Sequence, residues 1–280
     1  MKKQVIKAGL LGDPVSKSLS PRLFGIFSRL TGVELSYEAR RVAPGELRLE
    51  ITRARGEGWA GFNVTIPCKA EACGLLNLSD PAAKAAGAAN AVRFGRAGLE
   101  GLNTDAHALV EIFAERGLSL TGKSAAVFGS GGAAGAAGWA LGRSRAARVT
   151  FRARDHHKAS ALTARLEERF PDTVFSAAPF SAPEAAEDVL VNATPLGMYE
   201  PGMPPCSPEA GSLCVDLAYA AGGTEFLRRA AAAGAAAVDG LEILVWQAAL
   251  SLRFWTGLPS GDIVKFKNEA LSLLRSEKGE

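Results

Sequence analysis

The sequence predicts an α/β protein built from two domains. Short apolar runs alternate along the chain with longer amphipathic or alanine-rich stretches, and this alternation is typical of β-α-β units with mainly parallel sheets. The chain has 280 residues, of which 48% are hydrophobic, so it can bury a substantial core. Polar motifs rich in Ser, Pro and Asn occupy the first part, whereas a glycine-rich turn marks the second.

The apolar runs predict six strands. The first run follows a positively charged start, but Lys7 interrupts it and leaves an apolar stretch too short for a secretory signal. A helix that ends at Gly117 is expected between the second and third strands. The strands are expected at residues 5–11, 61–66, 124–128, 148–151, 189–192 and 214–217, and the helix at residues 103–117.

Two further stretches have a marked composition. Residues 230–237 are rich in alanine, and because alanine has the highest helix propensity this run is expected to be helical. Residues 201–208 contain four prolines and one glycine, which predicts a loop after the strand at residues 189–192. That loop either borders a ligand site or is a plain surface loop.

Charge and hydropathy patterning exclude two classes of protein. The 32 basic and 29 acidic residues give a net charge of +3, too small and too evenly scattered to predict nucleic-acid binding. No stretch approaches the roughly 18 uninterrupted apolar residues of a membrane helix. We therefore expect a cytoplasmic protein that acts on a small molecule, as a monomer or homodimer.

The cysteines and histidines predict neither a metal site nor disulfides. The cysteines lack the C-x-x-C spacing and have no histidines nearby, so they are expected to be reduced structural thiols. Two of the three histidines are adjacent in a charged stretch. The residues concerned are Cys68, Cys73, Cys206 and Cys214, and His107, His156 and His157.

The glycine-rich turn has the context of a dinucleotide site. The predicted strand at residues 124–128 runs directly into the sequence Gly129-Ser130-Gly131-Gly132-Ala133-Ala134, which a helix-compatible segment follows. Gly129 permits the tight turn, Gly131 lets the backbone approach a pyrophosphate, and Ala134 permits close helix packing. This order predicts a Rossmann-type nucleotide-binding domain. The alternative is a turn that merely packs tightly.

The end of the next strand bears on which dinucleotide is bound. An acidic residue there suits the ribose 2′-hydroxyl of NAD, whereas an arginine suits the 2′-phosphate of NADP. Here Arg154 can form paired, charge-assisted bonds to phosphate, with Arg152 as a second partner. NADP is therefore expected, and Asp155 leaves NAD as the alternative.

Seven segments together resemble the successive signatures of the shikimate dehydrogenase family, and they occur in the family's order. The resemblance covers most of the chain. The segments are GDPVSKSLSP at residues 12–21, NVTIPCK at 63–69, GAANAV at 87–92, GLNTD at 101–105, NATPLGM at 192–198, DLAY at 216–219 and GLEILVWQAA at 240–249.

The resemblance implies the reversible, NADP-dependent reduction of 3-dehydroshikimate to shikimate. It implies that Lys69 and Asp105 transfer the proton of the reacting hydroxyl. Taken alone, Lys69 would be a surface lysine and Asp105 a helix N-cap; their occurrence with the other motifs favours catalysis.

The resemblance also implies roles for the remaining residues. For the carboxylate of the substrate they are Ser18, Ser20 and Tyr219, and for its ring hydroxyls Thr65, Asn90 and Gln247. For the cofactor they are Gly129, Ser130, Gly131, Gly132, Ala133, Ala134, Arg152, Arg154, Thr194, Gly240 and Ile243. The implied domains are residues 1–104 with 241–280, where C-terminal helices return to the α/β substrate domain, and residues 105–240, the nucleotide domain.

The sequence departs from the family pattern at five positions, and two alternative functions stay open. One is a quinate/shikimate dehydrogenase that prefers NAD, and the other is a sensor of shikimate-pathway metabolites without turnover. Retention of Lys69 and Asp105 favours catalysis over the sensor. The departures are Lys17 where histidine is common, Ala91 for threonine, Ala153 for asparagine, Ala221 for proline and Ile243 for methionine.

Overall fold

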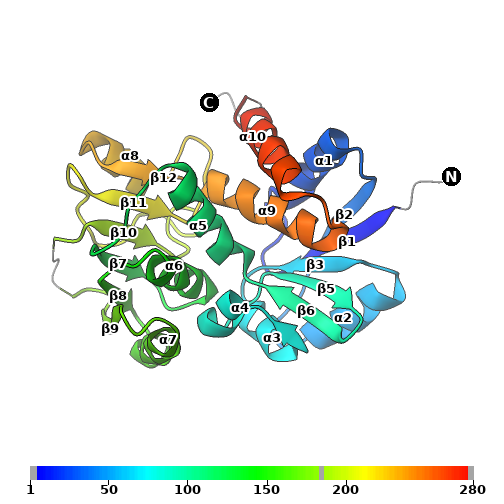
Figure 1. The fold of residues 1–280 in the computed structure, drawn as a ribbon, viewed down its shortest axis with the longest axis horizontal. Coiled ribbons are helices and arrows are strands. Elements are labelled where there is room, and N and C mark those ends of the chain that lie inside the picture. Colours follow the sequence, from blue (N-terminus) through cyan, green and yellow to red (C-terminus); the bar gives the residue numbers. More distant parts are fainter. Residues whose placement is uncertain (1–4, 183–185, 277–280) are drawn as a thin grey trace. The chain divides into compact units, whose positions relative to one another are not determined.

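The computed structural model describes residues 5–182 and 186–276 and divides the chain into two compact units (Figure 1). Unit 1 comprises Met1–Thr104 and Leu244–Glu280, and unit 2 comprises Asp105–Ile243. The chain passes from one unit to the other near the starts of two helices, α5 (Thr104–Glu115) and α9 (Gly240–Thr256). Each unit contains helices and one six-stranded sheet within the described ranges. The predicted α/β class is confirmed.

Unit 1 contains a mixed sheet with the strand order β2-β1-β3-β5-β6-β4. Strand β1 pairs in parallel with both of its neighbours, whereas β3, β5 and β6 pair antiparallel to one another. The antiparallel pairing of β3 with β5 places the start of β5 at the same edge as the end of β3, where Asn63 is opposite Ala91. The strands are β1 (Ile6–Gly12), β2 (Leu35–Arg41), β3 (Gly61–Val64), β4 (Leu78–Ser79), β5 (Ala91–Gly95) and β6 (Gly98–Leu102).

The C-terminal helices of the chain complete the core of unit 1. The indole of Trp255 on α9 lies 5.4 Å from the ring of Phe24, measured between centroids, and its Nε1 donates to the carbonyl of Val92 at 3.0 Å. In Figure 1, α10 lies beside α1. The helices of this unit are α1 (Ser20–Thr31), α2 (Leu47–Gly56), α3 (Lys69–Leu75), α4 (Pro81–Ala86) and α10 (Ser260–Ser276), together with most of α9.

Unit 2 contains a fully parallel sheet with the order β12-β11-β10-β7-β8-β9. The strand order reverses between β7 and β10, and in such sheets ligands bind beyond the carboxyl ends of the strands at that reversal. The strands are β7 (Ser124–Phe128), β8 (Arg148–Ala153), β9 (Val174–Pro179), β10 (Val189–Asn192), β11 (Leu213–Asp216) and β12 (Ala236–Val238).

Small residues let the first helix of this sheet pack closely. The helices after the strands are α6 (Gly132–Arg143), α7 (His156–Arg169) and α8 (Glu225–Ala232). A Cβ atom at Gly138 of α6 would lie 2.5 Å from the ring of Phe151 on β8. The alanine- and glycine-rich sequence of α6 thus lets its backbone approach the sheet, and this fixes the position of the glycine turn that precedes it.

The structure corrects one expected helix and adds strands that the sequence pattern did not predict. The alanine-rich run is helical only to Ala232, because Gly234 adopts a φ of 72° and residues Ala236–Val238 then pair with β11. Pairing with a buried strand overrides the helix propensity of alanine here. The strands not predicted are β2, β4, β5, β6, β9 and β12.

Candidate functional site

The predicted substrate residues of unit 1 gather at the carboxyl ends of β1 and β3. Ser18 lies in the loop after β1, Thr65 follows β3, and Lys69 begins α3. The two loops are in close contact, because a Cβ atom at Gly12 would lie 2.5 Å from Cγ2 of Thr65 and the backbone N–H of Asp13 donates to the carbonyl of Ile66 at 2.8 Å. Lys69 is half-buried.

A chain of buried polar side chains lies behind these loops. The hydroxyl of Tyr37 donates to Oδ1 of Asn63 at 2.9 Å, and Nδ2 of Asn63 donates to Oγ of Ser251 at 2.8 Å and to the carbonyl of Asn90 at 3.0 Å. Burial raises the pKa of Tyr37, and a hydrogen bond with Ser20 opposes that rise. Asn63 therefore ties β2, β3, α9 and the segment before β5 together.

Asn90 and Gln247 are both buried and lie close to each other. Oδ1 of Asn90 accepts hydrogen bonds from the backbone N–H of Thr104 at 2.6 Å and from its hydroxyl at 3.1 Å. Nδ2 of Asn90 faces Oε1 of Gln247 at 3.5 Å, and Nε2 of Gln247 donates to the carbonyl of Leu244 at 2.8 Å. Because its oxygen is held by Thr104, Asn90 is oriented to act on a ligand as a donor.

In unit 2, Asp105 lies in the first turn of α5 and has an exposed fraction of 9%.

The glycine turn links β7 to α6 at the reversal of strand order. Gly129 has a φ of 123°, and a Cβ atom there would lie 2.8 Å from the carbonyl oxygen of Ala193. At Gly131, by contrast, a Cβ atom would meet nothing within 4 Å. This open space beside the N-terminus of α6 fits a pyrophosphate, which backbone N–H groups and the helix dipole attract.

The end of β8 distinguishes the two predicted arginines. Arg154 is exposed just beyond the strand, whereas Arg152 is buried with its guanidinium 5.7 Å from the centroid of the Phe128 ring. Nη1 of Arg152 donates to the carbonyl of Ala182 at 3.3 Å. Arg152 thus has packing contacts of its own, and Arg154 is the arginine that is open to a phosphate.

Asp155, the residue that left NAD as the alternative cofactor, caps a helix. Its Oδ1 accepts a hydrogen bond from the backbone N–H of Lys158 at 3.0 Å, which places Asp155 at the N-cap of α7. This hydrogen bond lowers the pKa of the carboxyl group. The carboxylate of Asp155 is thus hydrogen-bonded to the start of its own helix. The end of β8 therefore favours Arg154 as the ligand of the cofactor, and with it a cofactor that carries a 2′-phosphate.

The remaining predicted residues lie in loops and a helix start at the same edge of the sheet. Thr194 follows β10, and its hydroxyl donates to Oδ1 of Asn192 at 2.6 Å. Tyr219 follows β11 and is half-buried, and Gly240 and Ile243 lie in the first turn of α9. Asp216, at the end of β11, is fully buried. Ser130, Gly132, Ala133 and Ala134 complete the turn and the start of α6.

The structure adds residues whose roles the sequence did not reveal. Except for Tyr37 on β2, they lie inside or near the motifs, which marked the segments but not the hydrogen bonds between them. In unit 1 they are Tyr37, Asn63, Thr104 and Ser251, and in unit 2 they are Asn192, Asp216 and Thr224.

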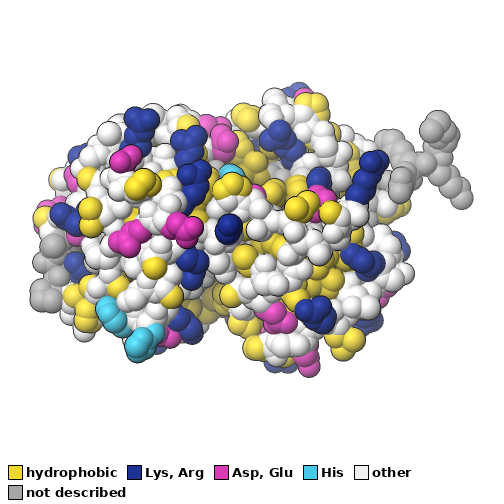
Figure 2. Space-filling model, turned by 60° about the horizontal axis from the view of Figure 1, so that its bottom comes forward, with side chains coloured by type: hydrophobic (Ala, Val, Ile, Leu, Met, Phe, Trp, Pro, Cys, Tyr) yellow, Lys and Arg dark blue, Asp and Glu magenta, His cyan; other side chains and the backbone are white. Residues whose placement is uncertain are grey.

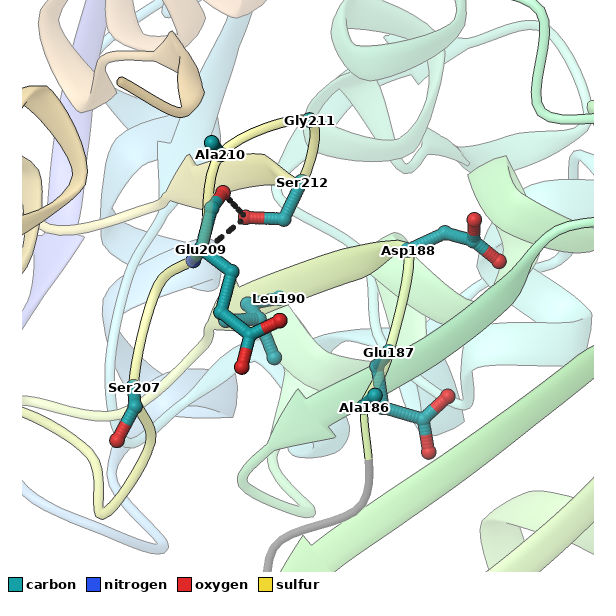
Figure 3. Close-up of a pocket in the computed structure, with 9 residues that line it drawn as sticks. All are labelled: Ala186, Glu187, Asp188, Leu190, Ser207, Glu209, Ala210, Gly211 and Ser212. Carbon is teal, nitrogen blue, oxygen red and sulfur yellow. Dashed lines mark hydrogen bonds between the residues drawn. The ribbon is translucent and has the colours of Figure 1, made fainter. Parts of the chain in front are cut away.

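Two other features of the surface lie outside these sites. On the face shown in Figure 2, Lys and Arg side chains are interspersed with acidic and uncharged ones. A hollow at the amino ends of β10 and β11 is lined by residues that include Glu187, Asp188 and Glu209. The carboxylate of Asp188 points away from that of Glu209 (Figure 3) and accepts a hydrogen bond from Nζ of Lys123. The hollow lies at the edge of the sheet opposite the glycine turn.

Two kinds of feature are absent from residues 5–182 and 186–276. No helix there is long and apolar enough to cross a membrane. No group of three or more His, Cys, Asp and Glu side chains there could hold a metal ion.

Comparisons with known proteins agree with the resemblance of the motifs. The family model described as shikimate dehydrogenase substrate binding domain matches residues 10–92. A protein of Anaeromyxobacter dehalogenans named shikimate dehydrogenase (NADP(+)) is 39% identical over 90% of this chain and 91% of its own length.

Solved structures extend the similarity to the whole fold. Shikimate 5-dehydrogenase of Thermus thermophilus, in complex with NADP(H) and shikimate, has a TM-score of 0.77 and 33% identity, with 95% of this chain and 99% of the other covered. Quinate dehydrogenase of Corynebacterium glutamicum, in complex with NAD, has a TM-score of 0.83 and 26% identity, with 96% and 100% covered.

Proposed function

This chain belongs to the shikimate dehydrogenase family, and from that premise we propose how its residues carry out the NADP-dependent oxidoreduction of shikimate. The observation that carries the proposal is the 39% identity over 90% of the chain, with every residue expected for proton transfer retained. We propose that unit 1 is the substrate domain and unit 2 the nucleotide domain.

The substrate residues divide by the chemistry of the groups they recognise. Hydroxyl donors suit a carboxylate, so we assign Ser18, Ser20 and Tyr219 to the acid group of shikimate. Thr65, Asn90 and Gln247 recognise the ring hydroxyls. Because Oδ1 of Asn90 already accepts from Thr104, Asn90 binds a ring hydroxyl through Nδ2 as the donor.

The proton of the reacting group passes through Lys69 and Asp105. NADPH, when bound, supplies the hydride that reduces the ketone of 3-dehydroshikimate. The ammonium group of Lys69 donates a proton to the ketone oxygen as negative charge develops on it, which stabilises that charge. Asp105 shares in this proton transfer, and in the oxidative direction the same pair takes up the hydroxyl proton.

The cofactor residues divide by the part of NADP that each binds. The backbone of residues 129–134 holds the pyrophosphate at the N-terminus of α6, and Arg154 binds the 2′-phosphate. Thr194, Gly240 and Ile243 face the nicotinamide end. We leave Arg152 as a secondary contributor, because its guanidinium already bonds to Ala182 and packs over Phe128.

The test is turnover by the purified protein with shikimate or quinate and with NADP⁺ or NAD⁺, followed by the absorbance of the reduced nicotinamide. We expect the highest kcat/KM with shikimate and NADP⁺. Dominance of quinate with NAD⁺ would support the quinate dehydrogenase function, which the structural similarity to that enzyme motivates. Absence of turnover with all four pairs would support a sensor without activity. A cytoplasmic location and a monomeric or homodimeric state stay predictions of the sequence.

A further inference from the structure

Asp216 is a fully buried carboxylate in unit 2 to which the mechanism above gives no task. We propose that Asp216 is a positioning residue that holds two loops in one arrangement: the β10 loop (residues 193–197), which carries Thr194, and the β11 loop (residues 217–224), which carries Tyr219. We infer this on the basis of the proposed function, because that function assigns Thr194 to the cofactor and Tyr219 to the substrate.

Three donors, one from the end of β10 and two from the β11 loop, converge on this carboxylate. Oδ1 of Asp216 accepts hydrogen bonds from Nδ2 of Asn192 at 2.8 Å and from the backbone N–H of Ala218 at 2.9 Å. Oδ2 accepts from the hydroxyl of Thr224 at 2.6 Å. Ala218 lies near the start of the β11 loop and Thr224 at its end, where it caps α8, so one side chain fixes both ends of this loop and the end of β10.

Asn192 connects Asp216 to the β10 loop through further hydrogen bonds. Its Oδ1 accepts from the backbone N–H of Thr194 at 3.1 Å and from the Thr194 hydroxyl at 2.6 Å, and its Nδ2 also donates to the carbonyl of Leu196 at 3.0 Å. The loop is pressed against the glycine turn, because a Cβ atom at Gly129 would lie 2.8 Å from the carbonyl oxygen of Ala193. A shift of Asn192 therefore moves the surroundings of the cofactor.

On the other side, Asp216 fixes the backbone that leads into Tyr219. The N–H of Ala218, one residue before Tyr219, is bound directly. The start of α9 packs against the backbone of Ala218, since a Cβ atom at Gly240 would overlap the carbonyl oxygen of that residue. Thr224 closes the β11 loop by accepting from the backbone N–H of Leu227 at 3.2 Å, which caps α8.

A carboxylate is suited to this position because it accepts several hydrogen bonds and donates none. Burial raises the pKa of Asp216 to about 6, and hydrogen bonds from Thr224, Ala218 and Asn192 oppose that rise. Alanine would leave three buried donors without this acceptor. Asparagine would keep the acceptor for Asn192 and Ala218, and its amide could donate to Thr224 after rotation of that hydroxyl. The arrangement should therefore survive in Asp216→Asn and fail in Asp216→Ala.

Asp188 provides a matched control at the other edge of the same sheet. Its carboxylate also accepts three hydrogen bonds, from Nζ of Lys123 at 2.7 Å and from the backbone N–H and hydroxyl of Ser124 at 2.9 and 3.2 Å. It lies just before β10, far along the strand from Asn192. Asp188→Ala thus removes a comparable anchor without touching either loop.

The experiment measures the KM for shikimate and for NADP⁺ and, without substrate, the binding of NADPH by nicotinamide fluorescence. In Asp216→Ala we expect both KM values to rise roughly tenfold or more, as loop misplacement predicts, with recovery in Asp216→Asn. Asn192→Ala should raise the KM for NADP⁺ more than that for shikimate. Asp188→Ala should lower Tm but leave both KM values close to wild type.

Both KM values unchanged in Asp216→Ala, or equal increases in Asp188→Ala, would overturn the inference. If Asp216→Ala does not fold, the unequal effect of Asn192→Ala decides, because a merely structural role would not separate the two KM values. Failure of the proposed function differs from failure of this inference, because the wild-type protein itself would then not oxidise shikimate at all.

Discussion

Oδ1 of Asn90 accepts a hydrogen bond of 2.6 Å from the backbone N–H of Thr104, the first residue of α5. The first N–H groups of a helix have no partner inside it, so this bond satisfies one of them. A residue assigned to substrate binding thus also fixes the start of the helix on which Asp105 is the next residue. The two roles use different atoms of one amide and can be separated by substitution.

Asn90→Asp should raise the KM for shikimate roughly tenfold while the start of α5 stays in place, although the buried carboxylate facing Oε1 of Gln247 lowers Tm. The carboxylate keeps an oxygen for the N–H of Thr104, but it loses the donor for a ring hydroxyl. Asn90→Ala removes both groups and should lower Tm as well. Steady-state kinetics and thermal unfolding of both variants test this; a normal KM in Asn90→Asp would contradict the donor role.

Lys69→Ala should lose most of its turnover, with kcat reduced on the order of a hundredfold to ten-thousandfold, as loss of a general acid predicts. NADPH binding, measured by fluorescence, should stay intact, because Lys69 lies in the other unit from the glycine turn. Lys84→Ala, an exposed lysine on α4, is the control and should be fully active. Near-normal kcat in Lys69→Ala would exclude the proposed mechanism.

Arg154→Gln should raise the KM for NADP⁺ roughly tenfold or more and leave the KM for NAD⁺ unchanged. A charge-assisted bond to the 2′-phosphate is lost only with the cofactor that carries this phosphate. Arg148→Gln, at the amino end of the same strand, is the control. Equal effects of Arg154→Gln on both cofactors would argue against recognition of the 2′-phosphate.

Gly131→Ala should raise the KM for NADP⁺ roughly tenfold without lowering Tm. The protein itself has room for the methyl group, since a Cβ atom there meets nothing within 4 Å and the φ of Gly131 is −84°. The new methyl would instead stand where a pyrophosphate approaches the backbone. Gly25→Ala, which also has open space around its Cβ, should not change the KM. An unaltered KM in Gly131→Ala would place the phosphate elsewhere.

The stability of the wild-type protein relative to Asp216→Asn should decrease as pH rises from about 4 to about 7. Burial raises the pKa of Asp216 from 3.8 to about 6, so the native state binds more protons than the unfolded state in this range. The corresponding stabilisation is complete below pH 4 and is lost as pH rises through about 6, a change of roughly 3 kcal/mol in the free energy of unfolding.

Asp188→Asn should give the opposite sign. A hydrogen bond from Lys123, supported by Ser124, lowers the pKa of Asp188. Its stabilisation is therefore present at neutral pH and is lost as pH falls through the lowered pKa. Urea unfolding of the two variants and the wild type between about pH 3 and pH 7 measures both trends. Parallel curves for wild type and Asp216→Asn would contradict the assigned pKa of Asp216.

Local sequence patterns were sufficient for features that neighbouring residues decide. The apolar runs predicted β1, β3, β7, β8, β10 and β11, and the glycine turn follows directly from β7. They did not reveal β2, which contains no continuous apolar run: Leu35, Tyr37 and Ala39 alternate there with the polar residues Ser36, Glu38 and Arg40. They failed also at residues 236–238, because the helix propensity of alanine gave no sign of a strand partner.

The sequence by itself determined the α/β class, six of the strands in their order along the chain, the glycine turn and the motifs that identify the family, since periodicity and turn chemistry act over a few residues. The tertiary structure alone decided that Asn63 bonds to Ser251, 188 residues away in the chain. It also decided that Arg152 is buried while Arg154 is exposed, and that Asp216 gathers three donors. Burial and hydrogen-bond partners belong to the folded arrangement, and no local pattern of residues specifies them.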